Sequence, residues 1–174
     1  MRAFIGIPVP PAPALKKTLD ALSRVQGLKT VEPENLHVNL KFLGDVNKEQ
    51  VEQTKQAMQT LAGTGAFSAK TTNISFFPHV IYATIDSQTH ITRLREILDA
   101  ALENLGFPRD EKFVEHVTLA RIKHETPTTR REARKTVENA LPIAEFKADK
   151  AFLYESILTQ KGPVYKPIHE VNFK

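Results

Sequence analysis

Two similar hexapeptides constrain the fold of this chain more than any other feature of its sequence. Residues 37–42 read His-Val-Asn-Leu-Lys-Phe and residues 116–121 read His-Val-Thr-Leu-Ala-Arg, so three of the six positions match. The two histidines are 79 residues apart in a chain of 174, which is close to half its length. Each hexapeptide lies in a segment with the apolar alternation of a strand, and a segment with helical periodicity follows each. The repeat therefore predicts two related halves that offer the same polar groups.

Apolar periodicity and turn residues divide the rest of the chain into short elements. We expect helices at residues 14–25, 48–61, 89–105 and 128–141. We expect strands at residues 2–9, 36–43, 115–122 and 164–173, two more within 67–85 on either side of Pro78, and one or two within 144–158. Because several strands follow one another directly, this order favours an α+β fold with antiparallel sheets over a doubly wound parallel sheet. The length fits a single domain over residues 1–174.

Strand geometry places the polar residues of each hexapeptide on one face. Side chains alternate between the two faces of a strand, so His37 and Asn39 point one way while Val38 points the other. His116 and Thr118 share a face in the same manner. The imidazole and the amide or hydroxyl are about 6.5–7 Å apart along each strand. Two such strands brought face to face would form a groove with two imidazoles and two hydrogen-bonding anchors.

A groove of this kind suits in-line attack on phosphorus. One neutral histidine takes a proton from the attacking water, and the other, protonated, gives a proton to the leaving oxygen. An unperturbed pKa of about 6.5 lets histidine serve in either form near neutral pH. Asn39 and Thr118 can donate hydrogen bonds to the non-bridging oxygens of the phosphate. A lone histidine on a strand is more often structural, but two at matching positions of a repeat favour an active site built on His37 and His116.

Composition narrows the class of site further. The chain has no cysteine, which excludes disulfides, thiolate catalysis and cysteine-based zinc sites. We see no metal-ligand spacing and expect neither a metal nor a cofactor. The sequence contains no signal-like or membrane-spanning run, so we expect a cytoplasmic protein without membrane contact. The net charge of +4 allows a polyanionic partner without requiring one. We interpret the basic run at residues 129–135 as a solvated helix face, with an RNA-backbone contact as the alternative.

The extended motifs resemble the two-histidine (2H) phosphoesterase superfamily, and within it the RNA 2',3'-cyclic phosphodiesterase branch, also called the 2'-5' RNA ligase family. That branch typically reads His-x-Thr-Leu-x-Phe-Leu-Gly and then His-x-Thr-Leu-Ala-Arg, which correspond here to residues 37–44 and 116–121. The opening residues 1–7 and the late segment 158–165 also resemble it. The resemblance therefore covers essentially the whole chain, in order.

This resemblance implies two pseudo-symmetric lobes, each an antiparallel sheet with helices on its outer face, and an active-site groove between them. It implies hydrolysis of a 2',3'-cyclic phosphate at an RNA end, for example on a tRNA fragment, to a 2'-phosphomonoester. The sequence says nothing of oligomeric state, and we take a monomer as the default. Related members also join or cleave 2'-5' linkages. His37 would be the proton donor to the 3' oxygen, and His116 the proton acceptor from water.

Further substrate contacts follow from the same comparison. The match suggests a phosphate-side role for Arg121, although a regular strand would place it on the face opposite His116. A structural ion pair is the alternative for Arg121. Lys161 and Tyr165, which flank a Gly-Pro turn, are candidates for contact with the nucleotide.

Two departures from the family pattern keep other functions open. Asn39 stands where the family usually has Thr or Ser, and the loop that often carries a basic residue before the fourth strand has His79 nearest. One alternative is an RNA-end binding module that turns over poorly because of Asn39. Another is a 2H esterase for a small cyclic nucleotide, which a groove with few basic residues would favour. A structural or interaction protein gives no reason for the polar repeat.

Overall fold

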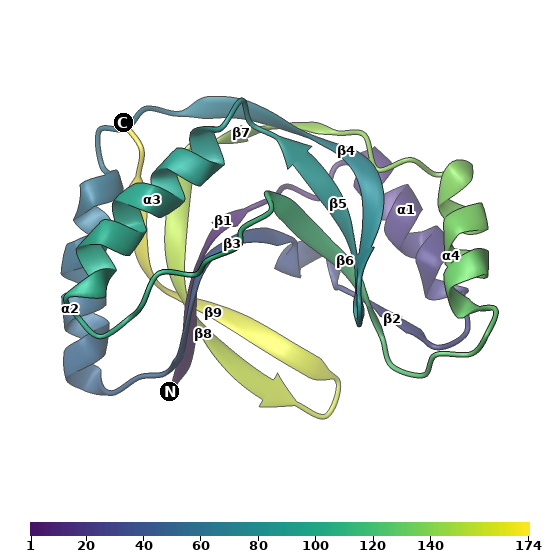
Figure 1. Cartoon of the computed structure of the whole chain (residues 1–174), viewed down its shortest axis with the longest axis horizontal. Helices are drawn as coiled ribbons and strands as arrows, with labels where there is room; N and C mark the ends of the chain where they lie inside the picture. Colours follow the sequence, from purple (N-terminus) through teal and green to yellow (C-terminus); the bar gives the residue numbers. More distant parts are fainter.

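The strands form two antiparallel sheets in the computed structural model, which describes residues 1–174. The first sheet has the order β3-β1-β8-β9 and the second the order β2-β6-β5-β4-β7 (Figure 1). The first sheet consists of β3 (His37–Asp45), β1 (Arg2–Pro8), β8 (Lys150–Thr159) and β9 (Gly162–Asn172). The second consists of β2 (Leu28–Thr30), β6 (His116–Ile122), β5 (Val80–Asp86), β4 (Phe67–Phe77) and β7 (Glu145–Ala148). Every pair of neighbours is antiparallel, as the direct succession of strands in the sequence predicts.

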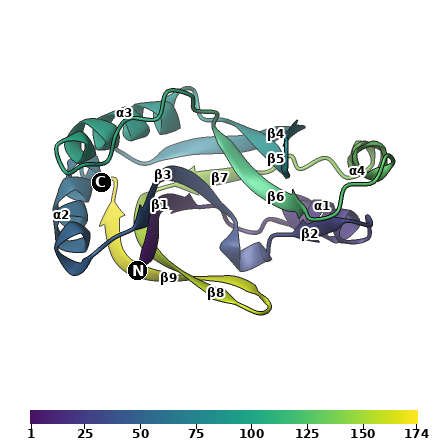
Figure 2. The same cartoon turned by 60° about the horizontal axis from the view of Figure 1, so that its bottom comes forward.

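Helices flank both sheets, so the expected α+β architecture of two sheets with helices is confirmed (Figures 1 and 2). They are α1 (Pro13–Ser23), α2 (Lys48–Met58), α3 (His90–Glu103) and α4 (Thr129–Glu138), with short 3-10 turns η1 (Pro33–Asn35) and η2 (Gln59–Leu61). α2 and α3 pack together beside the first sheet, and α1 and α4 pack together beside the second. No helix is both long enough and apolar enough to span a bilayer.

A local signal sets the start of α2, whereas the ends of the helices fall earlier than expected. α2 begins after a capping box, in which the Asn47 side chain accepts from the Gln50 amide at 2.9 Å and the Gln50 side chain accepts from the Asn47 amide at 3.0 Å. The predicted helices at 14–25 and 128–141 are two to three residues too long at their ends. Strand β2 was not expected, because three residues carry no readable alternation.

The two lobes are interleaved rather than formed from consecutive halves of the chain. Both halves repeat one order of elements, β1-α1 and β3-α2 in the first, β5-α3 and β6-α4 in the second. We call the first sheet with α2 and α3 the first lobe, and the second sheet with α1 and α4 the second lobe. Helix α1 comes from the first half of the chain but packs on β2, β6 and α4 of the second lobe. Helix α3 comes from the second half but packs against β3 and α2 of the first lobe. Strands β8 and β9 also return to the first sheet. Each lobe therefore contains one helix exchanged from the other half.

Both motif strands contain a bulge at the same position. The pairing of β1 with β3 passes over Leu40, and the pairing of β5 with β6 passes over Leu119. An extra residue in a strand reverses the alternation of faces beyond it. The burial of β3 from His37 to Leu43 accordingly matches that of β6 from His116 to Ile122 at every position. The regular strand assumed from the sequence was therefore wrong beyond the fourth residue of each motif.

The faces of these strands that point away from the histidines join one continuous hydrophobic core of 38 buried residues, drawn from both lobes. Val38 and Leu40 of β3 and Val117 and Leu119 of β6 are all at most 1% exposed. Burial of each such side chain contributes about 1.5–3 kcal/mol. This apolar anchoring fixes which face of each motif strand is left for the polar residues.

Candidate active site

A groove of about 930 Å³ lies where β3 and β6 approach each other. It is lined by His37 and Asn39 from one motif and by His116 and Thr118 from the other, so the structure brings the four predicted residues together. Further predicted residues also line it, namely Arg121, Lys161 and Tyr165.

His79 is placed elsewhere. It is exposed in the turn between β4 and β5, and its carbonyl accepts from the Ile122 amide at 3.0 Å. Its side chain does not line the groove. Arg121 differs from the strand-based expectation, because the bulge at Leu119 turns it to the groove side of β6.

Both imidazoles are held by the same hydrogen bond. His37 Nδ1 lies 2.7 Å from the carbonyl oxygen of Asn35, and His116 Nδ1 lies 2.7 Å from the carbonyl oxygen of Val114, two residues upstream in each case. A carbonyl only accepts, so each Nδ1 carries a hydrogen and donates. This fixes the neutral tautomer and leaves Nε2 of each ring as the atom that can take up or release a proton.

Aromatic rings fix the orientation of each imidazole in the same manner. The centroid of the His37 ring lies 4.7 Å from that of Phe4 and 5.2 Å from that of Tyr165, which meets it edge-on. The His116 ring lies 5.1 Å from Tyr82 and 5.4 Å from Phe77, also edge-on. A ring held by one hydrogen bond and two aromatic neighbours has little freedom to rotate.

The environment of His37 favours its neutral form in the free protein. Burial lowers the pKa of His37 below its ordinary value. The hydrogen bond to the Asn35 carbonyl opposes this shift, and repulsion from His116 and Arg121 adds to it. An anionic phosphate bound between the two histidines would raise the pKa again by favouring the charged imidazolium.

Asn39 follows His37 by two residues, at the position that Thr118 takes after His116. Its Oδ1 is buried without a hydrogen-bond partner. Asn39 lines the groove, where its Nδ2 can donate to an anion. An unsatisfied buried acceptor costs about 1–3 kcal/mol, a cost that a threonine at this position would avoid.

The groove is strongly cationic. Basic side chains without an acidic partner line it from both lobes, and they are Arg2, Lys29, Lys112, Arg121, Lys123 and Lys161. The carboxylates among the lining residues are Glu32 and Asp110, and Asp110 is already paired with Lys41. Such an excess of positive charge suits a polyanion with several phosphates. The groove therefore does not have the few basic residues that would favour a small cyclic nucleotide.

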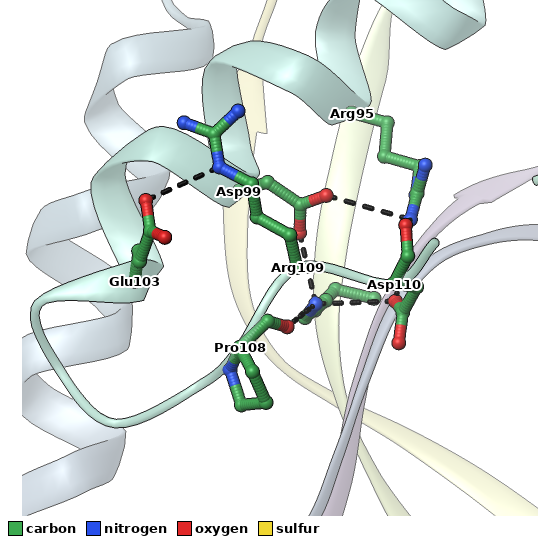
Figure 3. Close-up of polar contacts among 7 residues, drawn as sticks. Arg95, Asp99, Glu103, Pro108, Arg109 and Asp110 are labelled. Carbon is green, nitrogen blue, oxygen red and sulfur yellow. Dashed lines mark hydrogen bonds and ion pairs between the residues drawn. The ribbon is translucent and has the colours of Figure 1, made fainter. Parts of the chain in front are cut away.

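An ionic cluster, in which Lys41, Arg95 and Asp99 are buried and Asp110 is exposed, borders the groove. Sequence reasoning missed it. Lys41, 3% exposed, lies 2.9 Å from Asp99 Oδ1 and 3.1 Å from Asp110 Oδ2, and it also donates to the carbonyl of Pro108. Arg95 lies 3.4 Å from Asp99 and donates to the Asp110 carbonyl at 2.9 Å (Figure 3). The cluster ties the loop between α3 and β6, which leads to His116, to the strand that carries His37. The signal in the sequence was Lys41, a charged residue between two apolar residues of a predicted strand.

The basic run on α4 is not part of the groove. The guanidinium of Arg134 lies 4.3 Å from the centre of the Phe76 ring, and that of Arg130 donates to the Pro78 carbonyl at 2.6 Å. Arg131 and Lys135 are exposed to solvent. This arrangement agrees with a helix face rather than a part of the groove.

Residues of the β8–β9 hairpin line one side of the groove. Figure 2 shows the hairpin projecting beyond the rest of the first sheet. Lys29 Nζ of the second lobe donates to the Lys161 carbonyl at 2.8 Å, and Asn35 Nδ2 donates to the Pro163 carbonyl at 3.2 Å. The hairpin thus extends from the first sheet to β2 and η1. It contributes Lys161 to the lining of the groove and places the Tyr165 ring 5.2 Å from that of His37.

A family model and several related proteins match this chain over most of its length, and their descriptions agree. The family model described as the 2'-5' RNA ligase superfamily matches residues 10–158. A protein of Archaeoglobus fulgidus named RNA 2',3'-cyclic phosphodiesterase is 32% identical over 179 residues, covering 97% of this chain and 98% of the relative. A protein of Thermotoga maritima with the same name is 28% identical, covering 100% of this chain and 96% of the relative.

Solved structures agree in fold over nearly the full length. The crystal structure of TT0787 of Thermus thermophilus has a TM-score of 0.82 at 26% identity and covers 99% of this chain and 98% of that one. The structure of LigT of E. coli complexed with 3'-AMP has a TM-score of 0.78 at 18% identity, covering 98% of this chain and 97% of that one, a likeness of fold.

Proposed function

This chain belongs to the 2'-5' RNA ligase superfamily, and we propose that it hydrolyses the 2',3'-cyclic phosphate at an RNA 3' end to a 2'-phosphomonoester. The observation that carries the proposal is the pair of imidazoles held in one tautomer, by the same hydrogen bond, on facing strands of a cationic groove. The names of the relatives from Archaeoglobus fulgidus and Thermotoga maritima support the choice of substrate.

The reaction needs one proton acceptor and one proton donor. Water attacks phosphorus as Nε2 of His116 takes its proton, and a new P–O bond forms. The bond between phosphorus and the 3' oxygen breaks as protonated His37 gives its Nε2 proton to that oxygen. The products are a 2'-phosphomonoester and a free 3'-hydroxyl, with the proton of water now on His116. Exchange with solvent restores both histidines, and no step requires a metal.

The charge of the substrate prepares His37 for its role as donor. In the free protein His37 favours its neutral form, because burial lowers its pKa. The cyclic phosphate brings a negative charge between the two rings and so favours protonation of His37 on binding. The Asn39 amide and the Thr118 hydroxyl then donate to the non-bridging oxygens, whose charge grows in the transition state.

The same groove would also support 2'-5' ligation. A 5'-hydroxyl of a second RNA end can take the place of water, so that the attack produces a 2'-5' linkage instead of a 2'-phosphate. The proton transfers are unchanged. An RNA with a 5'-hydroxyl, supplied at high concentration beside the cyclic-phosphate RNA, would reveal this activity as a longer product.

We propose that the enzyme acts as a monomer, because one chain places His37, Asn39, His116 and Thr118 in a single groove. Sedimentation of the active enzyme tests the monomer, and activity confined to a larger species would contradict it. As substrates we propose RNA fragments with cyclic-phosphate ends, including tRNA fragments.

The first test is hydrolysis of a 2',3'-cyclic-phosphate RNA oligonucleotide in the presence of EDTA. His37→Ala and His116→Ala should each lower the rate by about 10²–10⁴-fold, the usual contribution of general acid–base catalysis. His79→Ala is the matched control, since His79 is exposed and outside the groove, and it should leave the rate unchanged. A wild-type protein that binds this RNA without cleaving it would instead support the RNA-end binding module.

A second experiment separates the donor from the acceptor. Sulfur in place of the 3' oxygen makes the leaving group a thiolate, whose conjugate acid has a pKa of about 8.5 and which departs without a donated proton. His37→Ala should recover hydrolysis on this substrate, and His116→Ala should not. Recovery by His116→Ala alone would reverse the two roles.

A further inference from the structure

The carboxylate of Glu115, the residue that precedes His116, is held by three hydrogen bonds at the start of α3. Its Oε2 accepts from the hydroxyl of Ser87 at 2.6 Å. Its Oε1 accepts from the backbone amide and from the hydroxyl of Thr92, at 2.9 and 2.7 Å. Glu115 forms no ion pair and does not line the groove, so direct contact with a substrate does not explain its place.

The turn between β5 and α3 depends on this carboxylate. Gln88 and Thr89 both have a positive φ, of 51° and 68°, a conformation that costs energy in residues other than glycine. Thr89 stands at the N-cap but makes no side-chain hydrogen bond to the helix. The amides of the first turn are satisfied instead by the Ser87 hydroxyl, which accepts from Ile91 at 3.0 Å, and by Glu115. A negative charge is also favoured at this end of a helix by the helix dipole.

The carbonyl that orients His116 has no comparable anchor of its own. It belongs to Val114, in the irregular stretch 107–115 that precedes β6. Val114 is 42% exposed and takes part in none of the backbone hydrogen bonds outside the helices and strands. Its position therefore depends on its neighbours, and Glu115 follows it directly. The Glu115 carbonyl also accepts from the Ile85 amide at 2.9 Å, so both the backbone and the side chain of Glu115 are fixed.

The first motif has an apolar residue at the corresponding position. Leu36 precedes His37, its carbonyl accepts from the Val9 amide at 2.9 Å, and its side chain is 2% exposed in the core. The two motifs thus share the backbone hydrogen bond but differ in what fixes the side chain before the histidine. Leu36 packs in the core, whereas Glu115 binds the helix that packs against β3 and α2 of the first lobe. Through Glu115, His116 of the second lobe is tied to the lobe that carries His37.

We propose that Glu115 is a positioning residue for the proton acceptor. Its three hydrogen bonds fix the Val114 carbonyl, which in turn holds the hydrogen on Nδ1 of His116 and directs Nε2 into the groove. The proposal rests on the proposed function for the role of His116 as acceptor, whereas the tautomer of the ring can be measured without turnover. Loss of these bonds should lower kcat and leave KM nearly unchanged, because other groups bind the phosphate.

Three variants separate the hydrogen bonds of Glu115 from its charge. Glu115→Ala removes all three bonds and should lower kcat by about 10- to 100-fold, in the range expected for a misplacement of about 1 Å. Glu115→Gln removes the charge but keeps an oxygen for Thr92 and an amide that can donate to Ser87, so it should retain most of the activity. Glu111→Ala is the matched control, because it removes an exposed carboxylate from the same loop, outside the groove.

Heteronuclear NMR of the imidazole nitrogens, at a pH at which the rings are neutral, measures the tautomer of His116 in the free protein. The wild type should carry the hydrogen on Nδ1, and part of the Glu115→Ala population should carry it on Nε2, with His37 unchanged. Urea denaturation shows whether each variant is folded under the assay conditions. Thr92→Val, which loses one of the three bonds, should shift the tautomer and kcat in the same direction by a smaller factor, and it replaces Glu115→Ala if that variant does not fold.

The outcomes separate this proposal from the proposed function. An unchanged tautomer of His116 in folded Glu115→Ala overturns the positioning role whatever the rate, and cleavage by the wild type would still support the enzyme assignment. An equal loss of kcat in Glu115→Gln and Glu115→Ala also overturns it, because the charge and not the hydrogen bonds would then act. If the wild type cleaves no cyclic-phosphate RNA but the tautomer shifts in Glu115→Ala, the positioning of His116 stands and the enzyme assignment is wrong.

Discussion

The two histidines owe their reactivity to contacts a few residues away. Each Nδ1 donates to a carbonyl two residues upstream, which determines that Nε2 carries out the chemistry. Burial, together with the charges of His116 and Arg121, lowers the pKa of His37. The protonation of His37 therefore depends on the charge that the groove contains.

The lowered pKa of His37 has a consequence for stability. Folding holds the pKa of His37 below its ordinary value of 6.5, so between 6.5 and the lowered value the unfolded chain binds more protons than the folded one. The neutral His37 side chain therefore contributes its full share of the unfolding free energy above pH 6.5. This share is lost as the pH falls toward the pKa of His37 in the folded protein. We expect the drop in unfolding free energy from pH 7.5 to pH 5 to be smaller in His37→Gln. Urea denaturation at both pH values measures it, and an unchanged drop would contradict the assignment; exposed His124→Gln is the control.

Asn39 gives a second prediction at this scale. Asn39→Ala removes a donor to the phosphate and should lower kcat by about 10²-fold. Asn39→Thr should retain most of the activity and raise the unfolding free energy by about 1 kcal/mol, because it removes the buried, unpartnered Oδ1. Rates on a cyclic-phosphate RNA and urea denaturation check both. Equal activity of Asn39→Ala and the wild type would show that the Asn39 amide does not donate a hydrogen bond to the phosphate in the transition state.

The bulged strands β3 and β6 are the elements that convert two short motifs into a site. Before the bulge, each strand directs a histidine and a hydrogen-bonding residue to the groove. After it, the reversed alternation turns Phe42 and Arg121 to the groove and allows Lys41 to enter the interior. A regular strand would have placed these residues on the other faces.

The buried Lys41 makes β3 dependent on its ionic partners. Lys41→Met keeps the aliphatic stem but leaves Asp99, 4% exposed, with Arg95 as its remaining cation. Removal of one member of a buried ion pair costs about 3–5 kcal/mol, and we expect a loss toward that range in urea denaturation. Lys55→Met, which breaks the exposed pair with Glu52, should cost less than about 1 kcal/mol. Similar losses in both variants would mean that the cluster contributes no more than a surface pair.

Across the whole molecule, interleaving joins the lobes on either side of the groove. Helices α1 and α3 each pack on the lobe built mainly from the other half of the chain, and the β8–β9 hairpin reaches from the first sheet to β2 and η1. Neither lobe is a consecutive stretch of the chain. The distance between the two histidines is therefore set by the packing of the entire molecule.

The charge of the groove predicts a marked salt dependence of RNA binding. When binding releases counterions, the logarithm of the binding constant falls linearly with the logarithm of the salt concentration. On a single strand the slope is about 0.7 for each phosphate neutralised. Lys123→Ala should reduce the slope by about that amount, since Lys123 is exposed and lines the groove. Arg131→Ala, on the outer face of α4, should not. The opposite pattern in anisotropy titrations from low to high salt would place the RNA on α4.

Residue order alone was enough to establish the parts of this protein that depend on local periodicity. The repeat predicted two strands with His37 and His116 facing the same groove, because side-chain alternation and the burial of Val38 and Val117 are local consequences of the residue order. The antiparallel sheets and most helix starts followed from the same kind of signal.

Long-range packing, by contrast, sets which residues surround those histidines. The bulges arise from pairing with β1 and β5, so the side on which Arg121 lies was not readable from its own strand. Lys41 enters the interior because Asp99 and Asp110, distant in the sequence, supply compensating charge. The exchange of α1 and α3 likewise depends on which apolar faces meet across the whole chain. Local periodicity carries no information about such distant partners, and these partners position Phe42, Lys161 and Tyr165 around the site.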